Sequence, residues 1–270
     1  MNFDLFEVRS VLFLPASNPR AIAKARESDA DLVVLDLEDA VKPADKAAAR
    51  DAAADALTSD WRMPVAIRIN GIGTEWHSLD LDAVAWSKAN VAVLPRAASA
   101  HLVREVREAI GKPLLAMIET AAGVLAAPAI AHETAALIAG TNDLAADLRL
   151  PADAGRAPLQ MALQTIVLSA RAAGIAAFDG VFNRLTDQQG FAAEAGEGRA
   201  LGFDGKSLIH PDQIAPCNRA FGASEAEVEK ARRLVEAFSG GAERFEDQMI
   251  ERMHVEAARR TLARAGRPLT

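Results

Sequence analysis

The chain has 270 residues, half of them hydrophobic, and its 30 Lys and Arg against 37 Asp and Glu give a formal net charge of −7. This composition is too apolar for an intrinsically disordered chain, and an acidic balance without a basic stripe argues against a nucleic-acid partner. The single cysteine, Cys217, excludes an intrachain disulfide and a cysteine-based zinc cluster. No apolar run approaches the roughly 20 residues of a membrane span, and the N-terminus lacks a basic signal segment, so we expect a cytoplasmic protein without a membrane partner.

Short runs rich in Val, Ile and Leu alternate along the chain with longer, alanine-rich stretches of helical spacing. Eight such runs occur, at residues 10–15, 32–37, 65–70, 91–95, 113–119, 135–140, 175–182 and 205–210. Continuous apolar runs separated by helices are typical of buried parallel strands. Eight strands alternating with helices predict an α/β fold of the (β/α)8 or TIM-barrel class. An open doubly wound sheet is the main competitor, but the first predicted turn lacks the glycine-rich G-x-G-x-x-G sequence.

Helix signals occur in the connecting segments. Asn18 followed by Pro19 predicts a helix N-terminus, because Asn accepts a backbone hydrogen bond there and Pro suits the first helical position. An alanine-rich helix is expected to begin at about Pro43. Another helix, over 157–173, is expected to end at Gly174, since glycine suits the left-handed residue that follows many helices.

The C-terminal part of the chain has no strand-like run after about residue 221. Segments 224–238 and 247–265 have helical spacing, and Ser239-Gly240-Gly241 joins them. Both helices are surplus to an eight-stranded barrel. The sequence therefore predicts a catalytic barrel over 1–222 and a helical extension over 223–270, which we expect to lie at a subunit interface.

Charged side chains recur at the carboxyl ends of the predicted strands. They are Asp36, Glu38, Arg68, Arg96, Glu119 and Asp143. Strand ends of this kind meet at one mouth of a (β/α)8 barrel, where active sites lie. Because burying so many charges is costly unless they are paired or bind a metal, they predict an active site rather than solvated strand ends.

The acidic groups at this mouth offer oxygen ligands only. No cysteine and no paired histidine accompanies them, which favours Mg²⁺ or Mn²⁺ over zinc. Mg²⁺ usually takes one or two protein carboxylates and keeps its other positions for water and substrate.

Seven short motifs follow one another along the chain. They are RSVLFLP at 9–15, DLED at 36–39, RIN at 68–70, ETAAGV at 119–124, NDLAADL at 142–148, GFDGKSLIHP at 202–211 and QMIE at 248–251. By their order and spacing, the chain resembles the citrate lyase β-subunit-like family of the HpcH/HpaI aldolase superfamily, which includes malyl-CoA and citramalyl-CoA lyases. The resemblance spans nearly the whole chain. It implies a (β/α)8 barrel, commonly a homotrimer, that binds a divalent cation and a CoA thioester.

The resemblance also implies roles for the charged residues at the mouth. Glu119 and Asp143 would bind the metal, while Asp36 and Glu38 would hold metal-bound waters. Arg68 would bind substrate oxygens beside the metal and stabilise developing negative charge.

Four further residues take roles from the same resemblance. Arg20 and Lys24, on the first helix, would meet CoA phosphates. Arg96 stands where the family usually has lysine and keeps the positive charge for substrate binding. Glu251 stands where the family usually has an aspartate that acts as acid/base in an adjacent subunit.

The implied reaction is reversible carbon–carbon cleavage of a 3-hydroxyacyl-CoA dicarboxylate, such as malyl-CoA, citramalyl-CoA or citryl-CoA. It would release a small α-keto acid and an acyl-CoA. Two alternatives stay open at this point. One is a metal-dependent aldolase that acts on free keto acids without CoA, and the other is a non-catalytic or accessory citrate lyase-like subunit.

Overall fold

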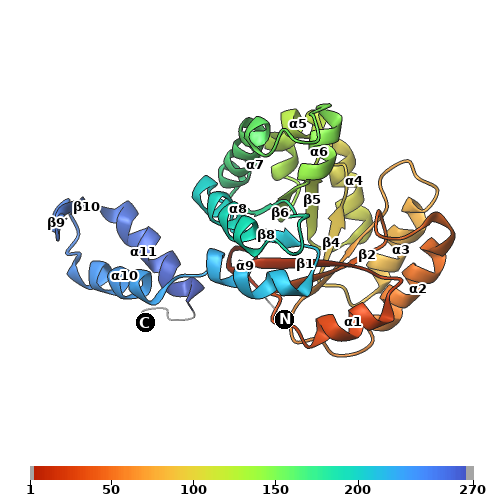
Figure 1. Cartoon of the computed structure of the whole chain (residues 1–270), viewed down its shortest axis with the longest axis horizontal. Coiled ribbons are helices and arrows are strands. Elements are labelled where there is room, and N and C mark those ends of the chain that lie inside the picture. The colour runs from red at the N-terminus through yellow and green to blue at the C-terminus, as the bar shows by residue number, and fades with distance from the viewer. Residues whose placement is uncertain (1–2, 266–270) are drawn as a thin grey trace. The chain divides into compact units, whose positions relative to one another are not determined.

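Eight parallel strands close into a barrel in the computed structural model, which describes residues 3–265 (Figure 1). In order around the barrel they are β1 (Ser10–Pro15), β2 (Leu32–Asp36), β3 (Val65–Arg68), β4 (Val91–Leu94), β5 (Leu114–Ile118), β6 (Ala136–Ala139), β7 (Ala176–Asp179) and β8 (Gly205–Leu208). Strand β8 pairs with β1, with Val11 opposite Ser207, and this pairing closes the barrel. The predicted fold class is confirmed, and all eight predicted strands are present.

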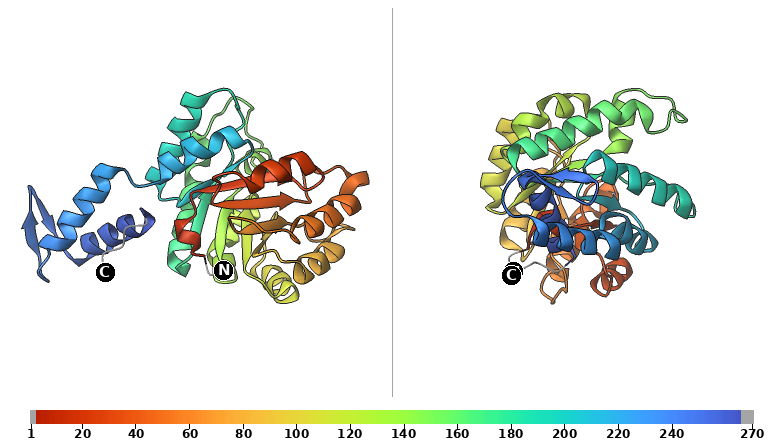
Figure 2. Two further views of the ribbon diagram at one scale, coloured as in Figure 1. Left: turned by 90° about the horizontal axis from the view of Figure 1, so that it is seen from below. Right: turned by 90° about the vertical axis from the view of Figure 1, so that its left-hand side faces the viewer.

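Helices follow the strands and surround the barrel (Figures 1 and 2). They are α1 (Pro19–Arg26), α2 (Lys46–Ala56), α3 (His77–Trp86), α4 (Ala100–Ile110), α5 (Ala121–Ala131), α6 (Thr141–Asp147), α7 (Gln160–Ala173), α8 (Gln188–Leu201) and α9 (Ile214–Phe221). The predicted end signals act as expected. The Asn18 side chain accepts the Ala21 N–H at 3.1 Å, and Gly174 follows α7 with a left-handed φ of 70°. A short 3-10 turn, Pro43–Asp45, precedes α2.

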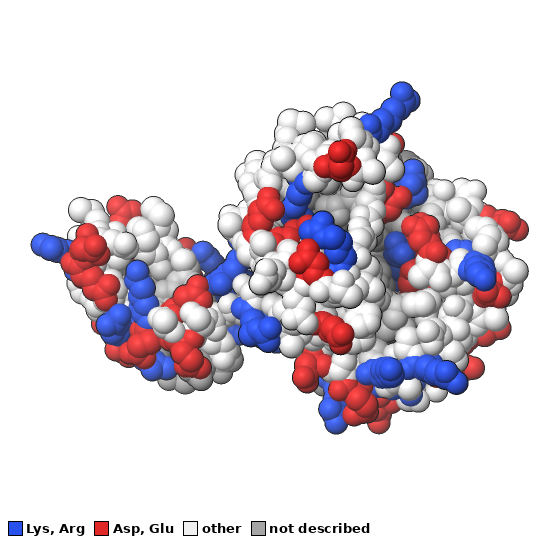
Figure 3. All heavy atoms as spheres, viewed as in Figure 1, with Lys and Arg blue, Asp and Glu red and all other residues white. Residues whose placement is uncertain are grey.

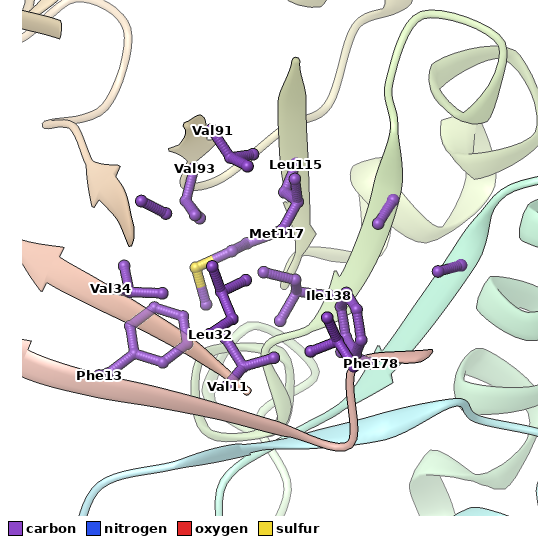
Figure 4. Packing of buried hydrophobic residues seen from close by; sticks show 14 residues of the cluster. Val11, Phe13, Leu32, Val34, Val91, Val93, Leu115, Met117, Ile138 and Phe178 are labelled. Atoms are coloured by element: carbon purple, nitrogen blue, oxygen red, sulfur yellow. The ribbon is translucent and has the colours of Figure 1, made fainter. Parts of the chain in front are cut away.

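Apolar side chains fill the interior of the barrel. Figure 4 shows Phe13, Val34 and Met117 among the buried residues that gather there, and Ala66 belongs to the same cluster. Because successive strand residues point to opposite faces, the inward position recurs every second residue. The next inward positions, two residues further along, are polar: they are Asp36, Arg68 and Glu119. The apolar interior ends at this level, and the mouth of the barrel begins.

The chain divides between Cys217 and Asn218 into two compact units. In the second unit, helices α10 (Glu225–Ala237) and α11 (Arg252–Arg264) pack through a small apolar cluster. Its buried members are Val228, Ala231, Ala258 and Leu262. None of the helices within residues 3–265 combines the length and the hydropathy needed to cross a bilayer.

The predicted helix over 247–265 is wrong in its first residues. A two-stranded antiparallel hairpin, β9 (Glu243–Phe245) and β10 (Gln248–Ile250), lies between α10 and α11. Glu246 has a left-handed φ of 54°, so the chain reverses there instead of entering a helix. Residues 248–250 consequently pair with β9, and α11 begins only at Arg252.

Candidate active site

A cavity of about 410 Å³ lies at the carboxyl ends of the strands. Its lining includes Asp36 at the end of β2, Arg68 at the end of β3, Glu119 after β5 and Asp143 in α6. Four of the predicted site residues thus share one cavity. Phe13, Met117 and Val181 are among its apolar lining residues. On the face drawn in Figure 3, acidic and basic side chains are interspersed rather than gathered by sign.

Two carboxylates hold the Arg68 guanidinium at this mouth. Its Nε and Nη2 atoms lie 2.7 and 2.6 Å from the two carboxylate oxygens of Asp36, a bidentate pair. Its Nη1 atom lies 2.7 Å from Glu38 Oε2. Arg68 is only 8% exposed, so these contacts are shielded from solvent and fix the plane of the guanidinium.

Asp36 also shapes the turn that follows β2. Its Oδ1 accepts the Glu38 N–H at 2.8 Å, and its Oδ2 accepts the Ala40 N–H at 3.2 Å. The turn brings Glu38 back toward Arg68. The carboxylates of Asp36 and Glu38 both contact Arg68. That they hold metal-bound waters stays a prediction.

Glu119 and Asp143 lie on the other side of the cavity, close to Arg96. Glu119 Oε1 accepts the Arg96 N–H at 2.6 Å, and the Arg96 Nη1 atom lies 3.9 Å from Asp143 Oδ1. The Arg96 φ of 51° is left-handed, which is uncommon for a residue other than glycine and accompanies the approach of its N–H to Glu119. A Cβ atom at Gly140 would overlap the Glu119 side chain, so this position requires glycine.

The electrostatics of the cavity favour a cation beside Glu119. Burial raises the pKa of Glu119 to about 7, and repulsion by Asp143 adds to the rise, while the Arg96 N–H opposes it. Burial likewise raises the pKa of Glu38 to about 7, opposed by Arg68. Arg68 is already paired with Asp36 and Glu38. The positive charge beside Glu119 and Asp143 is therefore that of Arg96.

The donor set fits a magnesium ion held by few protein ligands. Within residues 3–265, no group of three or more His, Cys, Asp and Glu side chains is arranged to hold a metal. Glu119 and Asp143 supply two carboxylates, and Mg²⁺ is commonly bound by one or two, with water and substrate completing its octahedron. The raised pKa of buried Glu119 is the feature that a bound cation would reverse.

The other predicted residues lie outside this cavity. Arg20 and Lys24 are exposed on α1 and line neither this cavity nor a second one of about 530 Å³. Arg96 and Glu38 line that second cavity. Glu251 is exposed in the second compact unit, immediately before α11, where its N–H donates to His254 Nδ1 at 2.9 Å.

Sequence reasoning missed two buried lysines. Lys46 is 5% exposed, although its place in an alanine-rich helix gave no sign of burial. Lys206 is fully buried in β8, with its Nζ atom 3.0 Å from Asp179 and 2.8 Å from Glu194. Here a signal was present, because a lysine inside an apolar strand needs a buried acidic partner.

Comparisons with known proteins agree with this fold. The model of the HpcH/HpaI aldolase/citrate lyase family matches residues 9–211. A (3S)-malyl-CoA thioesterase of Cereibacter sphaeroides is 42% identical over 268 residues, which cover 95% of this chain and 94% of that protein. The citrate lyase subunit beta of Escherichia coli is 33% identical over 280 residues, covering 95% and 93%.

A solved structure extends the comparison to three dimensions. Protein CitE from Mycobacterium tuberculosis, in complex with magnesium, acetoacetate and coenzyme A, superposes with a TM-score of 0.84 and 36% sequence identity. The match covers 97% of this chain and 100% of that chain. The (β/α)8 barrel, with its cavity at the carboxyl ends of the strands, has the architecture of an enzyme, and solved structures of CitE contain magnesium. The chain belongs to the HpcH/HpaI aldolase/citrate lyase family, a family of carbon–carbon lyases, and the resemblance predicted from its motifs is confirmed.

We expect Mg²⁺ to bind about tenfold more tightly at pH 8 than at pH 6, because the proton on Glu119 competes with the metal below a pKa of about 7. The ordinary pKa of a glutamate is 4.5, and that of Glu119 in the folded protein is about 7. The free energy of unfolding of the metal-free protein should therefore fall as the pH rises from 4.5 through 7. Mg²⁺ should restore that stability. Calorimetric titration and thermal unfolding at the two pH values measure both effects.

The matched control is Glu119→Gln, which removes the competing proton together with the carboxylate. Its residual Mg²⁺ affinity should be weak and should lack the pH dependence assigned to Glu119. Equal affinities of the unaltered protein at pH 6 and pH 8 would contradict the assignment.

Proposed function

We propose that this protein is a Mg²⁺-dependent carbon–carbon lyase. Its substrate is a CoA thioester of a 3-hydroxy dicarboxylic acid, such as malyl-CoA, citramalyl-CoA or citryl-CoA, and its products are a small α-keto acid and an acyl-CoA. The observation that carries the proposal is one cavity that joins a fixed guanidinium, Arg68, to two further carboxylates, Glu119 and Asp143, with Arg96 3.9 Å from Asp143. Membership in a carbon–carbon lyase family supports it.

In this proposal Glu119 and Asp143 hold the cation. When bound, Mg²⁺ supplies Lewis-acid polarisation and a template for the hydroxyl and carboxylate oxygens of the substrate. Arg68 donates two of its five N–H groups to Asp36, and its Nη1 atom forms an ion-pair contact with Glu38. The remaining edge of the guanidinium lines the cavity. That edge donates to the oxygen on which negative charge develops as the carbon–carbon bond breaks.

The CoA portion extends from the cavity over the rim of the barrel. Pro15, at the end of β1, lines the cavity, and α1 begins four residues later. The exposed Arg20 and Lys24 lie one turn apart on that helix and serve as contacts for CoA phosphates, aided by the helix N-terminus. Arg96 contributes positive charge beside Asp143 for the substrate carboxylate.

A second candidate reaction is hydrolysis of the same thioester. The observation in its favour is that the Cereibacter sphaeroides relative, 42% identical to this chain, is named a (3S)-malyl-CoA thioesterase. In hydrolysis, water attacks the thioester carbonyl, and free CoA and malate leave. The same Arg68 edge serves an oxyanion at the thioester carbonyl.

The products separate the candidates when the purified protein is incubated with Mg²⁺ and malyl-CoA. Cleavage of the carbon–carbon bond yields glyoxylate and acetyl-CoA, whereas hydrolysis yields malate and free CoA. We expect acetyl-CoA and glyoxylate in equal amounts. Malate with free CoA would transfer the assignment to hydrolysis. If malyl-CoA, citramalyl-CoA and citryl-CoA are not turned over but free keto acids are, the protein is the CoA-independent aldolase. If neither class of substrate is turned over, the accessory-subunit alternative is favoured.

Arg68→Lys provides the matched variant for that assay. An ammonium cannot bind Asp36 in the bidentate way, contact Glu38 and still face the cavity, so we expect kcat/KM to fall at least tenfold, about 1.4 kcal/mol. Thermal unfolding and Mg²⁺ titration of the variant show whether the fold and the metal site persist. A kcat/KM within about twofold of the unaltered protein would remove Arg68 from its assigned role.

The proposed assembly is a homo-oligomer, a trimer by the family resemblance, in which Glu251 reaches the active site of a neighbouring subunit. There its carboxylate transfers a proton at the carbon next to the thioester. Its exposure at the start of α11 supports availability for such a contact.

Mixing two inactive variants tests the shared site. Glu251→Gln and Glu119→Gln should each be inactive alone, and their mixture should regain part of the activity after subunit exchange, because some sites then receive both carboxylates. Mass spectrometry of the mixture verifies the exchange. No recovery in verified mixed oligomers, or full activity of Glu251→Gln alone, would exclude the shared site.

A further inference from the structure

Lys46 is a buried ammonium whose contacts all go to neutral oxygens. Its Nζ atom donates to the carbonyls of Leu37 at 2.7 Å and Glu38 at 2.8 Å, and to Asn70 Oδ1 at 2.6 Å. The Trp76 ring centre lies 5.0 Å away. An ammonium has three donors, so this one is fully used within the protein and has none left for a ligand.

These contacts and those of Asp36 together hold the turn after β2. The Asp36 carboxylate accepts the N–H groups of Glu38 and Ala40, while Lys46 binds the carbonyls of Leu37 and Glu38. Both polar groups of the Glu38 backbone are therefore held by buried side chains. The Glu38 carboxylate that leaves this turn reaches Arg68 Nη1 at 2.7 Å.

Asn70 connects the same turn to the next one. Its Nδ2 donates to Leu37 O at 3.0 Å and to Asp80 Oδ2 at 2.6 Å, and its N–H donates to the same Asp80 oxygen at 2.9 Å. Asp80 is fully buried, and its Oδ1 lies 2.7 Å from Arg50 Nε. Lys46 thus stands between the end of β2 and the end of β3, the two strands that carry Asp36 and Arg68.

We propose that Lys46 is a positioning residue for Arg68, acting through the Glu38 turn. Lys46 does not line the cavity that holds Arg68, Glu119 and Asp143, so it does not touch the substrate there. It fixes the Glu38 carboxylate, and that carboxylate sets one edge of the guanidinium. The reaction used to test the idea rests on the proposed function, whereas the positioning of Arg68 does not.

Lys46→Met removes the three donors and keeps an unbranched apolar chain. We expect kcat to fall about tenfold or more while KM for the thioester changes less than threefold, because substrate contacts remain and only the orientation of Arg68 is lost. The decisive comparison is a double-mutant cycle with Glu38→Gln. If Lys46 acts through Glu38, Lys46→Met should change kcat less than about twofold in the Glu38→Gln background.

Arg50→Met is the matched control, because it breaks the buried pair with Asp80 and leaves the Lys46 contacts in place. It should lower the melting temperature, and any effect on kcat should be the same with Glu38 or Gln at position 38. Where Lys46→Met does not fold, Lys46→Gln replaces it, because a shorter amide with two N–H donors cannot hold all three acceptors that Lys46 Nζ binds. The crystal structure of the folded variant gives a readout without activity: the Glu38–Arg68 contact should be lost and the Asp36–Arg68 pair retained.

Two results would overturn the inference. One is a Lys46→Met protein with a lowered melting temperature, unchanged kcat and an intact Glu38–Arg68 contact, which indicates stabilisation alone. The other is an equally large loss of kcat in the Glu38→Gln background, which shows that Lys46 acts by another route. If the unaltered protein turns over no thioester, the proposed function fails, and the crystal structure of the variant still decides the role of Lys46.

Discussion

The pairing of Arg68 with Asp36 and Glu38 is the contact on which the barrel mouth depends. Arg68 is nearly buried, and breaking such a pair by removing one partner leaves an uncompensated charge that costs about 3–5 kcal/mol. The three side chains therefore specify one another. Because Asp36 and Glu38 are paired with Arg68, Glu119 and Asp143 are the carboxylates of this cavity that can hold a cation.

Strand geometry explains why these groups meet. Asp36, Arg68 and Glu119 each lie two residues beyond an inward apolar side chain, and so each continues an inward position at the carboxyl end of its strand. The packed interior below supplies rigidity. The turn after β4 supplies Arg96, helix α6 supplies Asp143, and Gly140 leaves room for Glu119. One part of the mouth thus holds the Arg68 guanidinium in place, and another supplies the Glu119 and Asp143 carboxylates that could hold a metal ion.

Periodic patterns made the barrel predictable from sequence, because buried parallel strands impose continuous apolar runs. The charged residues at strand ends were predictable for the same reason. The short hairpin and the contacts of single buried side chains could not be predicted in this way. Three-residue strands β9 and β10 are too short for a period, and the left-handed Glu246 has no side-chain signature. The contacts of Lys46 go partly to backbone carbonyls, which no residue pattern records, and the pairing of Glu38 with Arg68 depends on a turn that Lys46 helps to hold.

Two carboxylates of the mouth pair with Arg68 and two others are proposed to hold the metal, and calorimetric Mg²⁺ titration of two variants distinguishes these roles. Glu119→Gln removes a carboxylate assigned to the metal, and Glu38→Gln removes one assigned to Arg68. We expect Glu119→Gln to weaken Mg²⁺ binding by about a hundredfold or more, and Glu38→Gln to retain it within about threefold. Equal losses in the two variants, or unchanged Mg²⁺ binding by Glu119→Gln, would show that the carboxylates are not divided in this way.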